Sequence, residues 1–90
     1  MVYRQVVFAV AGVLFATAVL AGNEVKGPIQ AIDVERQTVT VQGIALETGR
    51  HTDYDDGYRR FEDLREGDRV EVEFEYRDGR HIATEIERDD

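Results

Sequence analysis

The chain has 90 residues, a formal net charge of −8 and no cysteine. The lack of cysteine excludes a small domain stapled by disulfides, and it also excludes thiol chemistry. The acidic excess opposes binding to nucleic acid or to an anionic lipid surface by long-range repulsion. The length allows one small domain, which is marginally stable unless it packs well.

Residues 1–21 are predicted to be a signal peptide or an N-terminal membrane anchor. Arg4 is the only charged side chain before an uncharged run from Val6 to Gly22. The length of this run falls between the cores of signal peptides, about 7–15 residues, and spanning helices, about 17–25 residues. The ending Val19-Leu20-Ala21 favours cleavage, whereas retention would make the protein a single-span accessory subunit of a membrane complex. In both cases we expect residues 22–90 to lie outside the cytoplasm.

Residues 22–90 follow a period of two, which predicts a β domain. The first strands are expected at Val25–Val34 and Thr38–Val41. Val39 and Val41 fall on odd-numbered positions, whereas Ile44 and Leu46 fall on even-numbered ones. A β-bulge at Gly43 is therefore expected to return Ile44 and Leu46 to the core side.

The middle of the chain is polar and predicts a long loop over Glu47–Arg60, with one short strand at Thr52–Tyr54. Phe61–Leu64 is expected to form a single helical turn that packs onto the barrel. The clearest strand follows at Arg69–Tyr76, with its even-numbered apolar side chains facing inward, and the last strand is expected at Arg80–Glu87.

The register of these last two strands can be predicted from their apolar residues. A three-residue loop, Arg77-Asp78-Gly79, would place Phe74 opposite Ile82 and bury both. A two-residue loop would instead set Phe74 opposite Ala83. We expect the longer loop, which pairs Val70 with Ile86. The outward pairs are then Glu75 with His81, Glu73 with Ala83, and Glu71 with Glu85.

Five short strands and one helical turn predict an all-β fold, a small five-stranded OB-like antiparallel barrel after an N-terminal hydrophobic helix. Several turn and core motifs support this fold: Gly27-Pro28-Ile29, Ala31-Ile32-Asp33, Thr38–Gly43, Leu64 with Gly67-Asp68-Arg69-Val70, and Ile82–Ile86. With these motifs the chain resembles the DUF5666 family. The resemblance implies a bacterial extracytoplasmic β-barrel domain over residues 22–90, and it supplies no catalytic residue and no assigned function.

The densest set of candidate metal ligands lies in the predicted loop. If His51 is the first position of an EF-type calcium loop, then Asp53, Asp55 and Glu62 fall at the third, fifth and twelfth positions. Histidine is a poor first ligand for calcium, and Gly57 falls one position late. Two interpretations of this segment therefore remain, a calcium site and a solvated loop. No other cofactor is expected. A copper or zinc site would need more imidazole or sulfur ligands than two histidines and Met1 provide.

No catalytic residue is predicted, because the chain contains neither serine nor cysteine. Glu71, Glu73 and Glu75 alternate along one strand, which is typical of a solvated face. Together with Glu85 and an acidic loop (Asp53, Asp55, Asp56), they predict a surface that binds another protein with a basic surface. We therefore expect a non-enzymatic periplasmic or secreted interaction module. The alternatives are a periplasmic metal- or small-ligand-binding module and the membrane accessory subunit.

Overall fold

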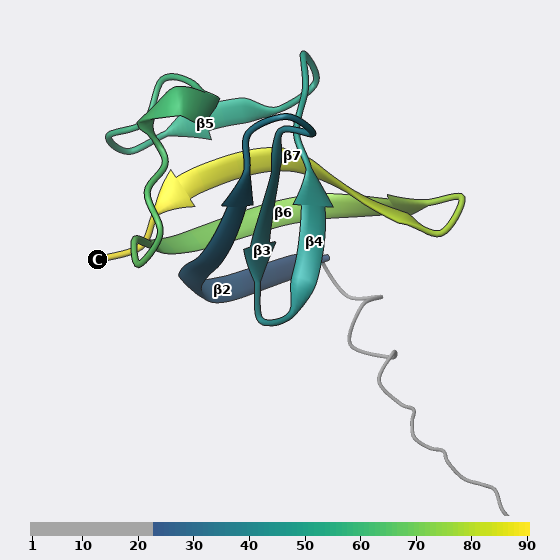
Figure 1. Cartoon of the computed structure of the whole chain (residues 1–90), viewed down its shortest axis with the longest axis horizontal. Coiled ribbons are helices and arrows are strands. Elements are labelled where there is room, and N and C mark those ends of the chain that lie inside the picture. The colour runs from purple at the N-terminus through teal and green to yellow at the C-terminus, as the bar shows by residue number, and fades with distance from the viewer. Residues whose placement is uncertain (1–22) are drawn as a thin grey trace, which may run out of the picture.

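A computed structural model describes residues 23–90, which form six strands and one 3-10 turn. The elements are β2 (Glu24–Asp33), β3 (Thr38–Val41), β4 (Ile44–Glu47), β5 (Asp53–Asp55), η2 (Phe61–Asp63), β6 (Arg69–Arg77) and β7 (Arg80–Arg88). The strand order is β4-β3-β2-β6-β7-β5, and an additional β4–β7 pairing closes five of the strands into a barrel (Figure 1). The predicted all-β, five-stranded barrel is confirmed.

Strand β2 serves both halves of the barrel because it bends. Residues 24–28 pair with β6, whereas residues 29–33 pair with β3. Gly27 lies at the bend with a φ of 149°, and a Cβ there would come within 3.3 Å of the Gln42 amide nitrogen. The same amide donates a hydrogen bond of 3.0 Å to the carbonyl of Lys26. Only glycine fits this close approach without strain.

The β3–β4 hairpin turns through Gln42 and Gly43, whose φ values are 54° and 76°. Val41 faces Ile44 across the hairpin, and Val39 faces Leu46. The predicted bulge at Gly43 is therefore wrong. The change of parity comes from a two-residue turn with two positive φ values, which brings both apolar pairs to one face.

The β6–β7 hairpin has a different register from the predicted one. Asp78 and Gly79 form a two-residue turn with φ values of 53° and 78°. Phe74 therefore faces Ala83, and Tyr76 faces His81, so the predicted Phe74–Ile82 pair is wrong.

A β-bulge explains how this register still fills the core. The ladder shifts between Glu73 and Phe74, and Val72 then faces Ile86. Val70 faces Arg88 instead of the predicted Ile86. The bulge lets Ala83 and Ile86 both be buried, a solution that an unbroken ladder cannot provide.

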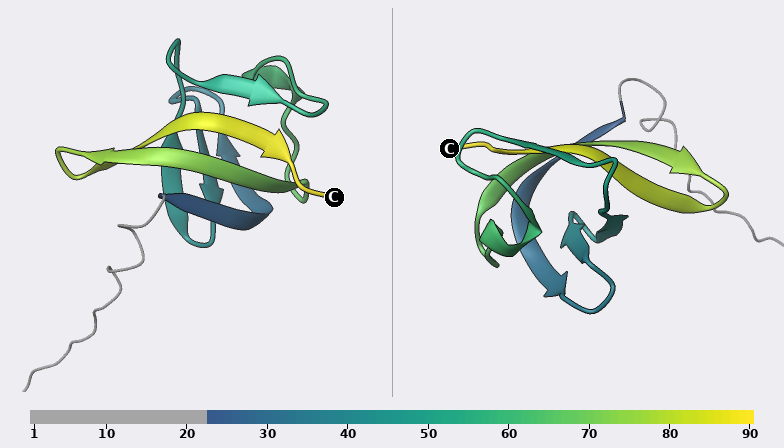
Figure 2. Two further views of the ribbon diagram at one scale, coloured as in Figure 1. Left: turned by 180° about the vertical axis from the view of Figure 1, so that it is seen from behind. Right: turned by 90° about the horizontal axis from the view of Figure 1, so that it is seen from above.

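The barrel interior holds one apolar core formed by all the main elements: Val25, Ile29, Val39, Val41, Leu46, Tyr58, Phe61, Leu64, Val70, Val72, Phe74, Ala83 and Ile86. The predicted short strand and helical turn are present as β5 and η2, and Phe61 and Leu64 are buried as expected. Tyr76 was expected inside but is 58% exposed. It lies on the β6–β7 hairpin, which projects beyond the barrel (Figure 2).

The predicted N-terminal signal or anchor, residues 1–21, lies outside the described residues. Within residues 23–90, no helix is both long and apolar enough to cross a membrane.

Candidate functional site: an acidic sheet face

Four neighbouring strands carry charged side chains on their outer surface. Side chains alternate between the two faces of a strand. Because Val25, Val72 and Ile86 are buried in the core, the charged residues beside them in β2, β6 and β7 point outward. On β5, Tyr54 packs against the core, so its two flanking aspartates lie on the outer side.

The strand registers align these outward residues in two rows. One row consists of Glu24, Glu73, Glu85 and Asp53. The second row consists of Lys26, Glu71, Glu87 and Asp55. We call these eight residues the acidic face. It contains one cation among seven carboxylates, and neighbouring strands in a sheet are only about 4.7–4.9 Å apart.

The carboxylates form two clusters within this face. Oxygens of Glu24, Glu71 and Glu73 lie within 4.8 Å of one another, and so do oxygens of Asp55, Glu85 and Glu87. Like charges directly opposite each other destabilise a sheet. Each cluster could therefore accept a cation through several oxygen donors.

The crowding changes the acidity of three glutamates. Partial desolvation, followed by the nearby Glu73 and Asp55 charges, raises the pKa of Glu85. Desolvation, followed by the Glu71 charge, likewise raises the pKa of Glu87.

Glu71 belongs to the other cluster and behaves in the same way. A hydrogen bond shared with the carboxyl of Glu24, together with desolvation, raises the pKa of Glu71. Lys26 opposes this shift from 3.8 Å away. All three shifts favour the protonated form, as expected where carboxylates are partly desolvated and lie beside other carboxylates.

At the β4–β7 closure, by contrast, a carboxylate has a cationic partner and its pKa is lowered. Arg80 of β7 donates hydrogen bonds of 2.6–3.2 Å to both carboxylate oxygens of Glu47 on β4, and this contact lowers the pKa of Glu47. The chain therefore pairs a cation with a carboxylate across the β4–β7 closure, but it leaves most of the acidic face without one.

The four predicted calcium ligands do not gather into one cluster. His51 lies against Gly49 in the turn before β5, and Glu62 lies in η2. Asp53 and Asp55 lie on β5, and Asp55 joins Glu85 and Glu87 instead. The reason is that residues 53–55 form a strand beside β7 instead of a calcium loop.

Three of the four predicted protein-contact residues belong to the acidic face: Glu71, Glu73 and Glu85. Glu75 lies beyond the bulge, where it forms an ion pair with Arg77. The predicted outward pairs are wrong, because Glu73 faces Glu85 and Glu71 faces Glu87.

Sequence reasoning missed Glu24 and Glu87 as members of the acidic face. Their alternation with apolar neighbours was a usable signal for their orientation. Their positions in the two rows depend on the β2–β6 and β6–β7 registers.

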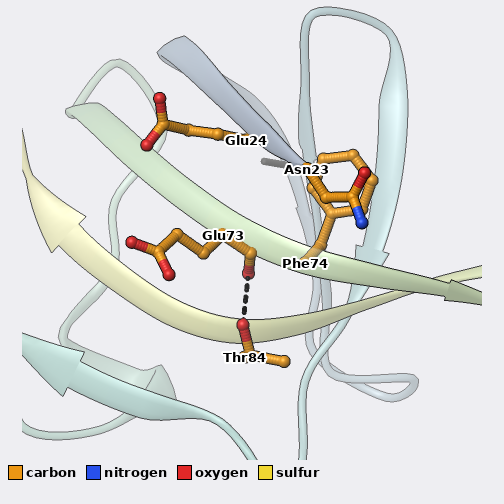
Figure 3. A pocket seen from close by; sticks show the side chains of 5 residues that line it. All are labelled: Asn23, Glu24, Glu73, Phe74 and Thr84. Atoms are coloured by element: carbon orange, nitrogen blue, oxygen red, sulfur yellow. Dashed lines mark hydrogen bonds between the residues drawn. The ribbon is translucent and has the colours of Figure 1, made fainter. Parts of the chain in front are cut away.

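A shallow pocket of about 360 Å³ adjoins the Glu24 end of the face and is lined by Asn23, Glu24, Glu73, Phe74 and Thr84 (Figure 3). The Thr84 hydroxyl donates a hydrogen bond of 3.1 Å to the carbonyl of Glu73. Asn23 Oδ1 is buried without a hydrogen-bond partner.

Solved structures with a similar fold include three of CusF. A CusF variant with Cu(II) from Escherichia coli has a TM-score of 0.61 and 14% identity, and the match covers 74% of this chain and 90% of that chain. Ag(I) CusF gives a TM-score of 0.59 with 14% identity, covering 73% and 95%. Apo-CusF from Escherichia coli gives 0.58 with 14% identity, covering 74% and 86%. At this identity the likeness shows a shared fold.

No curated protein matches the sequence significantly. The profile of a family described as a domain of unknown function, DUF5666, matches residues 26–87, which include nearly the whole barrel. The chain therefore belongs to the DUF5666 family.

Proposed function

We propose that this protein is a non-enzymatic binding module of the cell envelope whose acidic face binds a hard divalent cation such as calcium. The observation that carries the proposal is the cluster of Asp55, Glu85 and Glu87, whose carboxylate oxygens lie within 4.8 Å of one another. Such a cation would take oxygen ligands from two adjacent strands. The extracytoplasmic location rests on the N-terminal uncharged run.

The chemistry of the donors selects the class of metal. Calcium and magnesium prefer carboxylate and carbonyl oxygens, whereas soft ions such as Ag(I) prefer sulfur. The acidic face offers carboxylates and contains no sulfur or imidazole. Two of the CusF structures with a similar fold carry Cu(II) and Ag(I). We expect a different ligand here, because the donors on this face are hard.

The raised pKa values support the same proposal. Glu85 and Glu87 hold their negative charges at a free-energy cost, because desolvation and then the neighbouring anions oppose ionisation. A bound cation would offset that cost in the folded state and would not find the same cluster in the unfolded chain. Calcium should therefore stabilise the fold, by about 2.7 kcal/mol at a hundredfold excess over the dissociation constant.

The test is a thermal unfolding titration of the protein recovered from the envelope of expressing cells. We expect calcium to raise the melting temperature beyond the effect of sodium chloride at equal ionic strength. The sodium chloride control is essential, because salt screening alone also relieves surface repulsion. Silver nitrate in chloride-free buffer should produce no comparable shift.

Matched variants locate the effect. Glu85→Gln/Glu87→Gln should remove the calcium shift, and Asp55→Ala should weaken it. Glu35→Gln changes an exposed carboxylate in the β2–β3 turn and should keep the full shift. A shift that survives in the double variant, or that sodium chloride reproduces, would contradict the proposal.

A protein with a basic surface is a second candidate ligand, and the extent of the acidic face favours it. Two rows across four strands present more charge than a single cation neutralises. To test it, a photo-crosslinking residue would replace Glu73 in cells, with the same residue at Glu35 as the control. A specific adduct from position 73 that calcium does not displace would favour the protein partner over the metal.

A further inference from the structure

The β6–β7 hairpin projects from the barrel and has one strand edge without a partner in residues 23–90 (Figure 1). Pairing between β2 and β6 ends at Glu24 with Glu73, and one further hydrogen bond of 2.9 Å joins the Phe74 amide to the Asn23 carbonyl. Residues 75–77 of β6 continue beyond this point and pair with β7 alone among the described strands.

The free edge presents the backbone groups of Tyr76. Successive residues of a strand direct their N–H and C=O groups to opposite sides. Because the Phe74 amide points toward β2, the groups of Tyr76 point to the same side, two residues further on. Tyr76 is 58% exposed, and its ring packs edge-on against His81 at a centroid distance of 4.9 Å.

The sequence of this edge is complementary to itself. In an antiparallel pairing centred on Tyr76, Glu75 of each copy faces Arg77 of the other copy. Glu75 and Arg77 already form an ion pair within one strand, so pairing would join four charges of alternating sign. The two Tyr76 residues would exchange backbone hydrogen bonds and place their rings side by side, both favourable contacts across strands. We propose that the protein forms a homodimer by antiparallel pairing of these β6 edges.

The outer edge of β5 is less suited to self-pairing than the edge of β6. Self-pairing of β5 about Tyr54 would set Asp53 of each copy against Asp55 of the other. Like charges directly opposite each other are unfavourable, so charge protects this edge against self-association. Of the two edges, only that of β6 attracts its own copy.

The hairpin tip also avoids the repulsion expected between two acidic domains. Residues 75–80 contain two acidic and two basic side chains: Glu75, Arg77, Asp78 and Arg80. The tip is therefore locally neutral, although the whole chain has a net charge of −8. The acidic face lies on the other side of the bulge, on the barrel itself, so the dimer would leave it accessible.

The chain has no cysteine, so single cysteines can report on the contact. Cα atoms of residues directly opposite each other in an antiparallel pair are about 4.5–5.5 Å apart, within the range for a disulfide. We expect full-length Tyr76→Cys, oxidised with diamide, to give a disulfide-linked dimer on a non-reducing gel. Val34→Cys is the collisional control, because Val34 is 71% exposed and lies after β2. It should crosslink about tenfold less.

Charge reversal provides the decisive comparison. In the Tyr76→Cys background, Arg77→Glu should reduce crosslinking about tenfold, which corresponds to about 1.4 kcal/mol. The swap Glu75→Arg/Arg77→Glu should restore it, because the edge is again self-complementary. Arg36→Glu, an equal charge change in the exposed β2–β3 turn, should have no effect. A thermal melt confirms that each variant is folded.

Three results would overturn the proposal. Equal crosslinking at positions 34 and 76 would indicate random collision. Loss of crosslinking in Arg77→Glu without rescue by the swap would exclude the charge pairing. Absence of crosslinking at position 76 would show that this edge does not pair with a second copy.

Discussion

Tyr58 should be a main attachment point between the long polar segment and the barrel. Its side chain is 4% exposed, and its hydroxyl donates a hydrogen bond of 2.7 Å to Asp68 in the turn before β6. The guanidinium of Arg88 lies 4.7 Å above its ring and 4.0 Å from the Asp68 carboxylate. Tyr58 thus connects the segment after β5 to the ends of β6 and β7.

Tyr58→Phe removes the hydroxyl and keeps the ring. A hydrogen bond to a charged group is worth about 1.5–3 kcal/mol, and we take the lower end because Asp68 is partly exposed and keeps the Arg65 amide as a partner at 3.2 Å. A loss of about 1.5 kcal/mol corresponds to a fall of roughly 6–12 °C in melting temperature for a domain of this size. Tyr58→Ala should cost more, about 3–5 kcal/mol, because the ring also leaves the core.

The assay is thermal or urea unfolding, followed at neutral and alkaline pH. Burial and the bond to Asp68 raise the pKa of Tyr58 to about 12. The folded state therefore holds this proton more tightly than the unfolded chain, so the stability is present below pH ~10 and is lost as pH rises toward 12. Tyr58→Phe should lose less stability than the wild type over that interval. A variant with unchanged melting temperature and an unchanged alkaline profile would refute the role of this hydrogen bond.

Four further predictions concern the acidic face, the bend and the N-terminus. Lowering the pH from 7 should first stabilise the fold, because the three glutamates with raised pKa bind protons more readily in the folded state; saturating calcium should remove the share of this gain that comes from Glu85 and Glu87 in a pH series of thermal melts. Glu85→Arg should stabilise the domain in urea unfolding, since the new cation faces Glu73 and Asp53, and it should weaken any cationic ligand; a destabilised fold would contradict the row register. Gly27→Ala should cost at least about 1 kcal/mol, because its φ of 149° is strained for a residue with a Cβ and the contact with the Gln42 side chain would be tight. An intact mass beginning at Gly22 or Asn23 is expected for protein recovered from cells, whereas a full-length chain in carbonate-washed membranes would favour the membrane-anchored subunit.

The strands and the helical turn could be predicted because their signals are local. Alternation identified β2, β3, β6 and β7 within one or two residues, and Phe61 with Leu64 identified η2. The OB-like connectivity stays a prediction. The turns could not be assigned with the same success. Gln42 and Asp78 both adopt positive φ, and this conformation is set by the hairpins that close around them.

The candidate site was harder to predict because it depends on four strands at once. The outward orientation of Glu71, Glu73 and Glu85 followed from alternation. Their alignment with Glu24 and Asp53 depends on the β2–β6 and β5–β7 registers, which join residues far apart in the chain. The bulge after Glu73 shifted every pair beyond it by one residue. The two-residue turn and this bulge each moved the register by one residue, and together they changed the predicted neighbours of the whole face.

The acidic face is hard to explain as a device for stability alone. A barrel this small, without disulfides, has little stability to spare. Elsewhere the chain places opposite charges together, as in Glu47 with Arg80 and Glu75 with Arg77. On the acidic face it sets Glu73 against Glu85, an arrangement that costs stability in every unliganded molecule. Local departures from stabilising patterns are expected at functional sites, so the rows mark the surface where a cationic ligand should be sought.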